Sequence, residues 1–154
     1  MSNSEHGPKA QYPFYCSTPV QMRFNDIDML GHLNNNSYFQ LYDLGRYDYL
    51  VKLRGTGTDG AHPQPQAMIV NLNCSFLSQT RFNETVEVLT QIVHMGDKSF
   101  TMMQQVVNVE TGEVKSECES VLVYFDWDTG CPARIPDEWR RDVAMAEHRP
   151  DLNP

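Results

Sequence analysis

The sequence predicts an α+β fold in which one long helix packs against a curved antiparallel sheet. A strongly apolar stretch at residues 38–53 has helical spacing. Four later stretches alternate between apolar and polar residues, as strands do. Short turn sequences separate these stretches, which is typical of hairpins and so of an antiparallel sheet. One helix can cover one face of such a sheet.

The chain begins with a polar segment that has no apolar core. We therefore expect residues 1–15 to be a mobile lead-in and not a secretory signal. Residues 19–24 (PVQMRF) alternate over a short run and are predicted to form the first strand.

The helix is predicted to run from Tyr38 to Leu53. Its apolar residues cover most of its circumference, so we expect it to be buried on more than one side. Asn36 or Ser37 is suited to cap its first turn, and the asparagines before them tolerate left-handed turns. Residues 55–65 (GTGTDGAHPQP) are rich in helix breakers and predict a loop.

The remaining chain supplies the other strands and a second helix. Alternation predicts strands at residues 68–76, 86–92, 100–106 and 114–124, which with the first strand make five. Hairpin turns are expected at residues 96–98 (GDK) and 110–113 (ETGE), and residues 126–130 end the last strand. Residues 136–148 predict a short C-terminal helix with Pro136 near its start.

Composition fits one domain and limits the classes of partner. The 154 residues are 40% hydrophobic, and the formal net charge of −8 argues against a general attraction to nucleic acid or to anionic membranes. No apolar run approaches the length of a membrane span. The four cysteines form no C-x-x-C pair, so we expect no cysteine zinc site, and a reducing cytoplasm is the simplest location.

Polar residues gather just before the helix, at residues 25–38 (NDIDMLGHLNNNSY). A helix start presents unsatisfied N–H groups that, with the helix dipole, favour negative charge, including that of an oxyanion developing on a substrate carbonyl. A carboxylate beside them could act as a general base or as a nucleophile. Acyl transfer needs this combination of groups.

Two other interpretations of the same residues remain open. Asp and Asn before a helix are more often turn formers and caps than catalysts. A metal site could be built from Asp26, Asp28 and His32, but a third firm ligand is missing, so we expect no metal.

Residues 23–46 (RFNDIDMLGHLNNNSYFQLYDLGR) strongly resemble the 4-hydroxybenzoyl-CoA thioesterase family of the hotdog-fold superfamily. The family motif D-x-D-x-x-G-H-x-N-N-x-x-Y is met from Asp26 to Tyr38, and an acid and an arginine follow at Asp43 and Arg46. Weaker likeness continues at residues 96–99 (GDKS), 121–126 (VLVYFD) and 135–136 (IP).

The resemblance covers residues 19–140 and implies a hotdog fold, a long central helix wrapped by a five-stranded antiparallel sheet. We expect one hotdog thioesterase domain at residues 16–140, with the end of the C-terminal helix and a tail at residues 141–154.

The implied activity is that of an acyl-CoA thioesterase. Asp28 falls where the family carries its catalytic aspartate and would be general base or nucleophile. Gly31 would permit a sharp turn and close approach of the thioester. Main-chain N–H groups near Asn34 and Asn35 would polarise the thioester carbonyl.

Other motif residues have alternative roles. His32 could orient Asp28 or a water, or could hydrogen-bond across the turn, and Asp26 is expected to shape the loop. Asp43 replaces the glutamate that is common at this position and is one methylene shorter. It could face the pocket as a catalytic acid, or it could form an ion pair with Arg46.

Coenzyme A carries phosphates, so an acidic chain needs local cations to bind it. Arg81, Lys98 and Arg134 lie in or near predicted turns, and Lys98 with Ser99 matches a turn of the family. Each could instead be an ordinary surface charge. Tyr38 could contact the substrate, although aromatic residues at helical spacing are more often core. No cofactor is expected beyond the coenzyme A thioester that serves as substrate.

Hotdog proteins of this type pair into dimers with a continuous sheet, so the resemblance implies a homodimer or homotetramer, with a site completed near residues 71–75 of a second subunit. Three other functions are alternatives to this one. A dehydratase or hydratase would carry a proline between the aspartate and a histidine one residue further away, and residues 28–32 (DMLGH) have no proline. Acyl carrier protein could replace coenzyme A, and a hotdog protein could bind acyl-CoA without catalysis.

Overall fold

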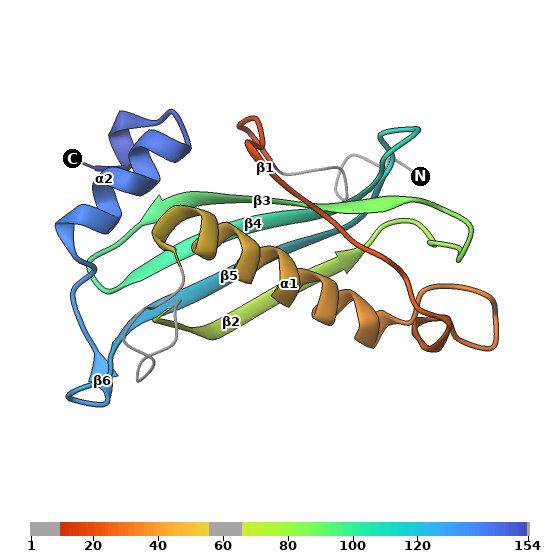
Figure 1. The fold of residues 1–154 in the computed structure, drawn as a ribbon, viewed down its shortest axis with the longest axis horizontal. Helices are drawn as coiled ribbons and strands as arrows, with labels where there is room; N and C mark the ends of the chain where they lie inside the picture. Colours follow the sequence, from red (N-terminus) through yellow and green to blue (C-terminus); the bar gives the residue numbers. More distant parts are fainter. Residues whose placement is uncertain (1–9, 56–65, 154) are drawn as a thin grey trace.

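The computed structural model describes residues 10–55 and 66–153, so the expectations for residues 1–9 and for most of the 55–65 loop lie outside the described residues. A single long helix, α1, lies across one face of an antiparallel sheet (Figure 1). The elements in chain order are β1 (Cys16–Pro19), α1 (Asn35–Arg54), β2 (Ala67–Phe76), β3 (Val86–Met95), β4 (Ser99–Asn108), β5 (Val114–Asp126), β6 (Cys131–Pro132) and α2 (Asp137–Ala146).

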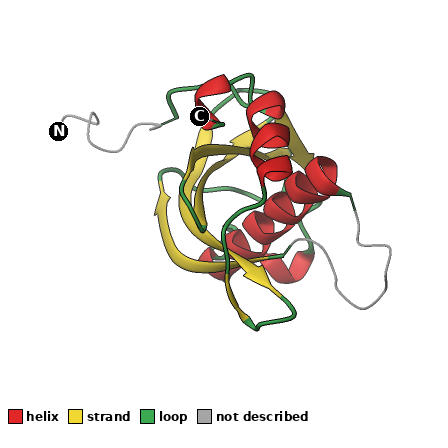
Figure 2. Cartoon of the chain, turned by 90° about the vertical axis from the view of Figure 1, so that its left-hand side faces the viewer, coloured by secondary structure: helices red, strands yellow, loops and turns green. Residues whose placement is uncertain are grey.

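The strand order is β1-β3-β4-β5-β2, with the two-residue β6 paired to the far end of β5. Every pairing is antiparallel. Viewed along the helix, the sheet curls around α1 (Figure 2). The predicted α+β hotdog fold is therefore confirmed.

The expected hairpin turns and the second helix are where the sequence predicts them, but the first strand is not. β1 comes earlier, at Cys16–Pro19, while Phe24–Asp26 form a single 3-10 turn. Pro19 is the last residue of β1 and has no N–H to extend the ladder, so the alternation that follows it is not strand. The prediction of a strand at residues 19–24 is wrong.

Helix α1 begins three residues earlier than predicted. Asn34 is the N-cap, in an extended conformation, and its side chain accepts a hydrogen bond from the Asn36 N–H. The expectation of a cap at Asn36 or Ser37 is therefore wrong, because the backbone already turns at Asn34. At its other end α1 stops at Gly55, which has a φ of 77°.

Gly45 lets α1 approach the sheet closely. A Cβ at this position would lie 2.6 Å from Val88 Cγ1 and 2.8 Å from Gln104 Nε2. The buried Gln104 amide donates to the Tyr42 carbonyl oxygen at 3.1 Å and accepts from the Arg46 guanidinium at 2.9 Å. The centre of the helix is thus held on β4 by a polar network within an apolar core.

Two apolar clusters lie on either side of this network. One joins the first half of α1 to Val86, Val88 and Val106. The other joins the second half to β4, β5 and α2 and includes Trp139. Strand β2 lies at the edge of the sheet. Most of its apolar side chains belong to neither cluster and are exposed: Met68, Ile69, Val70, Leu72 and Phe76. Within the described ranges, no helix is long and apolar enough to cross a membrane.

Candidate active site

The motif loop folds into a tight turn just before α1. The Asp28 N–H donates to the His32 carbonyl oxygen at 2.9 Å, and the Gly31 N–H donates to the Asp28 carbonyl oxygen at 3.1 Å. Gly31 has a φ of 80°, a conformation that glycine adopts at little cost. The sharp turn expected at Gly31 is therefore present.

Asp26 holds the base of the loop. Its buried carboxylate accepts from the Arg23 N–H at 2.8 Å and from the Arg23 guanidinium at 3.0 Å, and Ser37 Oγ donates to it at 3.3 Å. The hydrogen bonds from Arg23 hold the pKa of this carboxyl below its usual range. Asp26 shapes the loop, as the sequence predicts.

Asp28 presents its carboxylate at the surface of the turn. Oδ1 accepts from the Leu30 N–H at 2.9 Å and from the His32 N–H at 3.2 Å. Both bonds use Oδ1 and neither uses Oδ2. The turn thus fixes the orientation of the carboxylate. No hydrogen bond to Oδ2 is present within residues 10–55 and 66–153, so this oxygen is available for chemistry.

At the start of α1, one main-chain N–H has no hydrogen-bond acceptor among the described residues. The Asn34 N–H donates to the Asp26 carbonyl oxygen at 2.7 Å, the Asn36 N–H to the Asn34 side chain, and the Ser37 N–H to the Asn34 carbonyl oxygen. In the parts of the chain that the structure describes, the Asn35 N–H makes no such bond. Of the two asparagines named from the sequence, Asn35 is therefore the one that can donate to a substrate.

A cavity of about 270 Å³ brings these groups together. Asp28, His32, Asn35 and Tyr38 line it from the motif loop and the first turn of α1, and residues 76–79, at and beyond the end of β2, form the opposite wall. No motif marked residues 76–79. Tertiary contacts bring them to the loop: the Leu33 N–H donates to the Thr80 carbonyl oxygen at 2.7 Å, and His32 makes a β-bridge with Arg81.

The polar groups of Tyr38 and Asp43 are bonded to other side chains of the protein and do not face the cavity as free groups. Tyr38 is 2% exposed, and its hydroxyl lies 2.7 Å from Thr80 Oγ1, so burial raises its pKa. Its ring packs against Phe76 at 5.2 Å between centroids. Asp43 forms an ion pair with the buried Arg46 on the surface of α1 and does not line the cavity.

The predicted phosphate-binding residues divide into two locations. Arg81 makes a β-bridge with His32, so it lies beside the motif loop. Lys98 lies in the β3–β4 turn and Ser99 begins β4, at the end of the sheet away from the start of α1 (Figure 1). Arg134 pairs with Asp97 and Asp137 near the same turn.

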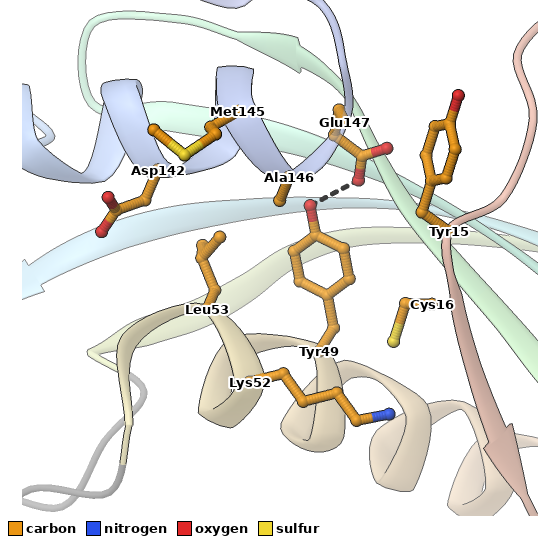
Figure 3. Close-up of a pocket in the computed structure, with 9 residues that line it drawn as sticks. All are labelled: Tyr15, Cys16, Tyr49, Lys52, Leu53, Asp142, Met145, Ala146 and Glu147. Carbon is orange, nitrogen blue, oxygen red and sulfur yellow. Dashed lines mark hydrogen bonds between the residues drawn. The ribbon is translucent and has the colours of Figure 1, made fainter.

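A larger cavity, of about 330 Å³, lies at the other end of α1. Figure 3 shows it between α1, α2 and the segment leading into β1, with the Tyr49 hydroxyl donating to the Glu147 carboxylate at its edge. Tyr49 is some fourteen residues beyond Asn35, which is about 21 Å along a helix. This cavity is therefore separate from the motif and contains none of its residues.

The donor groups do not favour a metal centre. The Asp26 carboxylate is committed to Arg23 and Ser37, which removes one of the two acids of the metal interpretation. Across residues 10–55 and 66–153, no three histidine, cysteine, aspartate or glutamate side chains gather closely enough to hold an ion.

Comparisons with known proteins show the family of this chain. Residues 22–143 match the thioesterase-like superfamily. The uncharacterized protein YsmA of Bacillus subtilis (strain 168) is 25% identical over 130 residues, or 84% of each chain.

Two solved structures extend the likeness to three dimensions. A thioesterase from Thermus thermophilus, complexed with coenzyme A and Zn, is 26% identical with a TM-score of 0.77, covering 89% of this chain and 97% of that one. A predicted thioesterase from Bacillus stearothermophilus is 25% identical with a TM-score of 0.75, covering 88% and 98%. With the family match spanning most of its length, the chain belongs to the thioesterase-like superfamily.

Proposed function

We propose that the protein is an acyl-CoA thioesterase that hydrolyses a thioester to a free acid and coenzyme A. The observation that carries the proposal is the cavity shared by Asp28 and Asn35. It combines a carboxylate oxygen and a helix N-terminal N–H that both have no hydrogen-bond partner in the described part of the chain. These are the two groups that acyl transfer requires.

The reaction follows from these two groups. The Asn35 N–H, aided by the dipole of α1, stabilises the negative charge that develops on the thioester oxygen. Asp28 Oδ2 either removes a proton from a water that attacks the carbonyl carbon, or attacks that carbon itself. The carbon–sulfur bond then breaks, and the coenzyme A thiolate leaves and is protonated. On the nucleophilic route this leaves an acyl–Asp28 anhydride, which water hydrolyses to the free acid and the Asp28 carboxylate.

The carrier and the assembly state belong to the same proposal. The Thermus relative was solved with coenzyme A, which supports the same carrier here. The apolar side chains exposed on edge strand β2 support a homodimer, with two copies of β2 pairing antiparallel. In that arrangement the Ala67 end of a second copy adjoins the Phe76 end of the first.

Such pairing would also bring the two predicted phosphate-binding regions closer. Ser99 lies opposite Val123, next to the Tyr124–Ala67 pair, about two strand spacings or 10 Å from β2. Lys98 and Ser99 of one copy would then approach the Asp28 loop and Arg81 of the other. This geometry supports their assignment to coenzyme A binding across the dimer.

The test is release of free thiol from aromatic, short-chain and long-chain acyl-CoAs, with acyl carrier protein thioesters in parallel. We expect Asp28→Asn to lower turnover by at least about 100-fold. Asp128→Asn, the same change in an exposed turn, serves as the matched control and should keep full turnover. Saturable binding of acyl-CoA without turnover by the wild type would instead indicate a binding protein.

A second measurement tests whether Asp28 is the nucleophile. After a single turnover in heavy-oxygen water, a nucleophilic carboxylate acquires label when water attacks its own carbonyl carbon. Label on Asp28 therefore establishes the nucleophilic route, whereas label in the product acid alone is expected both for a general base and for an anhydride that water opens at its acyl carbon.

A further inference from the structure

Two cysteines lie directly opposite each other beneath the first half of α1. Cys74 on β2 pairs in register with Cys118 on β5, and their Sγ atoms are 2.8 Å apart. Both are free thiols. Neither belongs to the motif or lines the candidate active site.

The ladder around them has the geometry that a cross-strand disulfide needs. The Leu77 N–H donates to the Lys115 carbonyl oxygen at 2.9 Å, which marks residues 77 and 115 as a hydrogen-bonded pair. Such pairs recur at every second residue of an antiparallel ladder, so Cys74 and Cys118 form a non-hydrogen-bonded pair. The Cα atoms of these pairs are about 4.5 Å apart, within the range that a disulfide spans.

The two thiols differ in access and in charge. Cys118 is 0% exposed, whereas Cys74 is only partly buried. The hydrogen bond that Cys74 shares with Cys118 lowers the pKa of the Cys74 thiol against the opposing effect of burial, and the nearby Arg46 charge lowers it further. The same partner and burial raise the pKa of Cys118. Cys74 is therefore the thiol that ionises first and that a small oxidant reaches.

We propose that Cys74 and Cys118 form a reversible disulfide in the presence of a hydroperoxide, which ties edge strand β2 to β5. The Cys74 thiolate attacks the terminal peroxide oxygen, and with one proton gives a sulfenic acid and water or an alcohol. The Cys118 sulfur then attacks the Cys74 sulfur, releasing a second water. Two thiols are oxidised and one peroxide bond is reduced.

The bond would be closed with little movement of the strands. The sulfurs need to approach from 2.8 Å to about 2.0 Å. Cys74 packs against the cluster beneath α1, so its side chain points to the helix and not along the open edge of β2. The disulfide is therefore compatible with a second copy pairing along that edge.

The inference does not depend on thioesterase activity, and its test needs no substrate. The full chain carrying Cys131→Ser is treated with hydrogen peroxide and digested with trypsin without reduction. This variant is needed because Cys118 and Cys131 otherwise share the tryptic peptide 116–134. We expect the peptides 55–81 and 116–134 to be joined and two hydrogens lighter, and dithiothreitol to separate them.

Stability and single variants give independent readouts. Oxidation should raise the Tm by about 5 °C or more. Cys118→Ser should lose the crosslink and the Tm rise, and its Cys74 should become a sulfenic acid that dimedone traps. The same peroxide treatment should oxidise the exposed Cys131 of the wild type. If Cys74 and Cys118 both remain free thiols under those conditions, the proposal is overturned. Sulfinic acid on Cys74 without any crosslink would overturn it as well.

Discussion

Replacing Gly45 with alanine should destabilise the protein, although alanine is the better helix former. The added Cβ would lie 2.6 Å from Val88 Cγ1 and 2.8 Å from Gln104 Nε2, both closer than packed atoms allow. That Nε2 also donates to the Tyr42 carbonyl oxygen and to Thr90 Oγ1, each at 3.1 Å. The methyl group can therefore be accommodated only by moving α1 or by breaking this network.

The magnitude follows from three opposing contributions to the free energy of unfolding. Overpacking a filled core costs about 1–3 kcal/mol. The two Gln104 hydrogen bonds are worth about 1 kcal/mol each. Replacing a helical glycine with alanine returns about 1 kcal/mol. We expect a net loss of about 2–4 kcal/mol, or a fall in Tm of about 4–16 °C for a domain of this size.

Urea unfolding followed by circular dichroism, at one protein concentration for all variants, measures this loss. A double-mutant cycle with Val88→Ala is the control, because it removes the atom that the new methyl meets first. The double variant should be more stable than the sum of the single changes predicts, by about 1 kcal/mol or more. If Gly45→Ala is as stable as the wild type, or more stable, the close contact between α1 and the sheet is refuted.

Two further predictions concern other parts of the fold. Asn34→Ala should lower the free energy of unfolding by about 1 kcal/mol, because the Asn36 N–H loses its capping acceptor, whereas Asn34→Asp should retain most of it in the same urea assay. Burial raises the pKa of Glu147, so its ionisation opposes folding, and the stability of the wild type relative to Glu147→Gln should fall as the pH rises from about 4 to about 8. Gln is the suitable replacement because its side-chain oxygen, like that of Glu147, can accept from Tyr49 and from the Ile92 N–H. If the difference in Tm between the two proteins does not change with pH, the pKa of Glu147 is not raised by folding.

The sequence predicts most of the fold because its local signals agree with the tertiary structure. The hairpin turns at residues 96–98 and 110–113 join β3 to β4 and β4 to β5 as expected. The first strand was missed because β1 has only four residues and ends in a proline, which is too short for alternation to show. The cap was misplaced because residues 34–36 are three chemically equal asparagines, and only the backbone conformation distinguishes them.

The sequence alone determined the motif loop, since the Asp28 turn, the positive φ of Gly31 and the start of α1 all arise within a dozen residues of continuous chain. Such contacts depend on local conformation and can therefore be predicted from the sequence. The tertiary structure decided what forms the opposite wall of the cavity, and that Cys74 meets Cys118 across 44 residues. The wall depends on the contacts of Thr80 and Arg81 with the motif loop, and the cysteine pair depends on how β2 pairs with β5. A pairing between distant segments leaves no signal in either segment by itself.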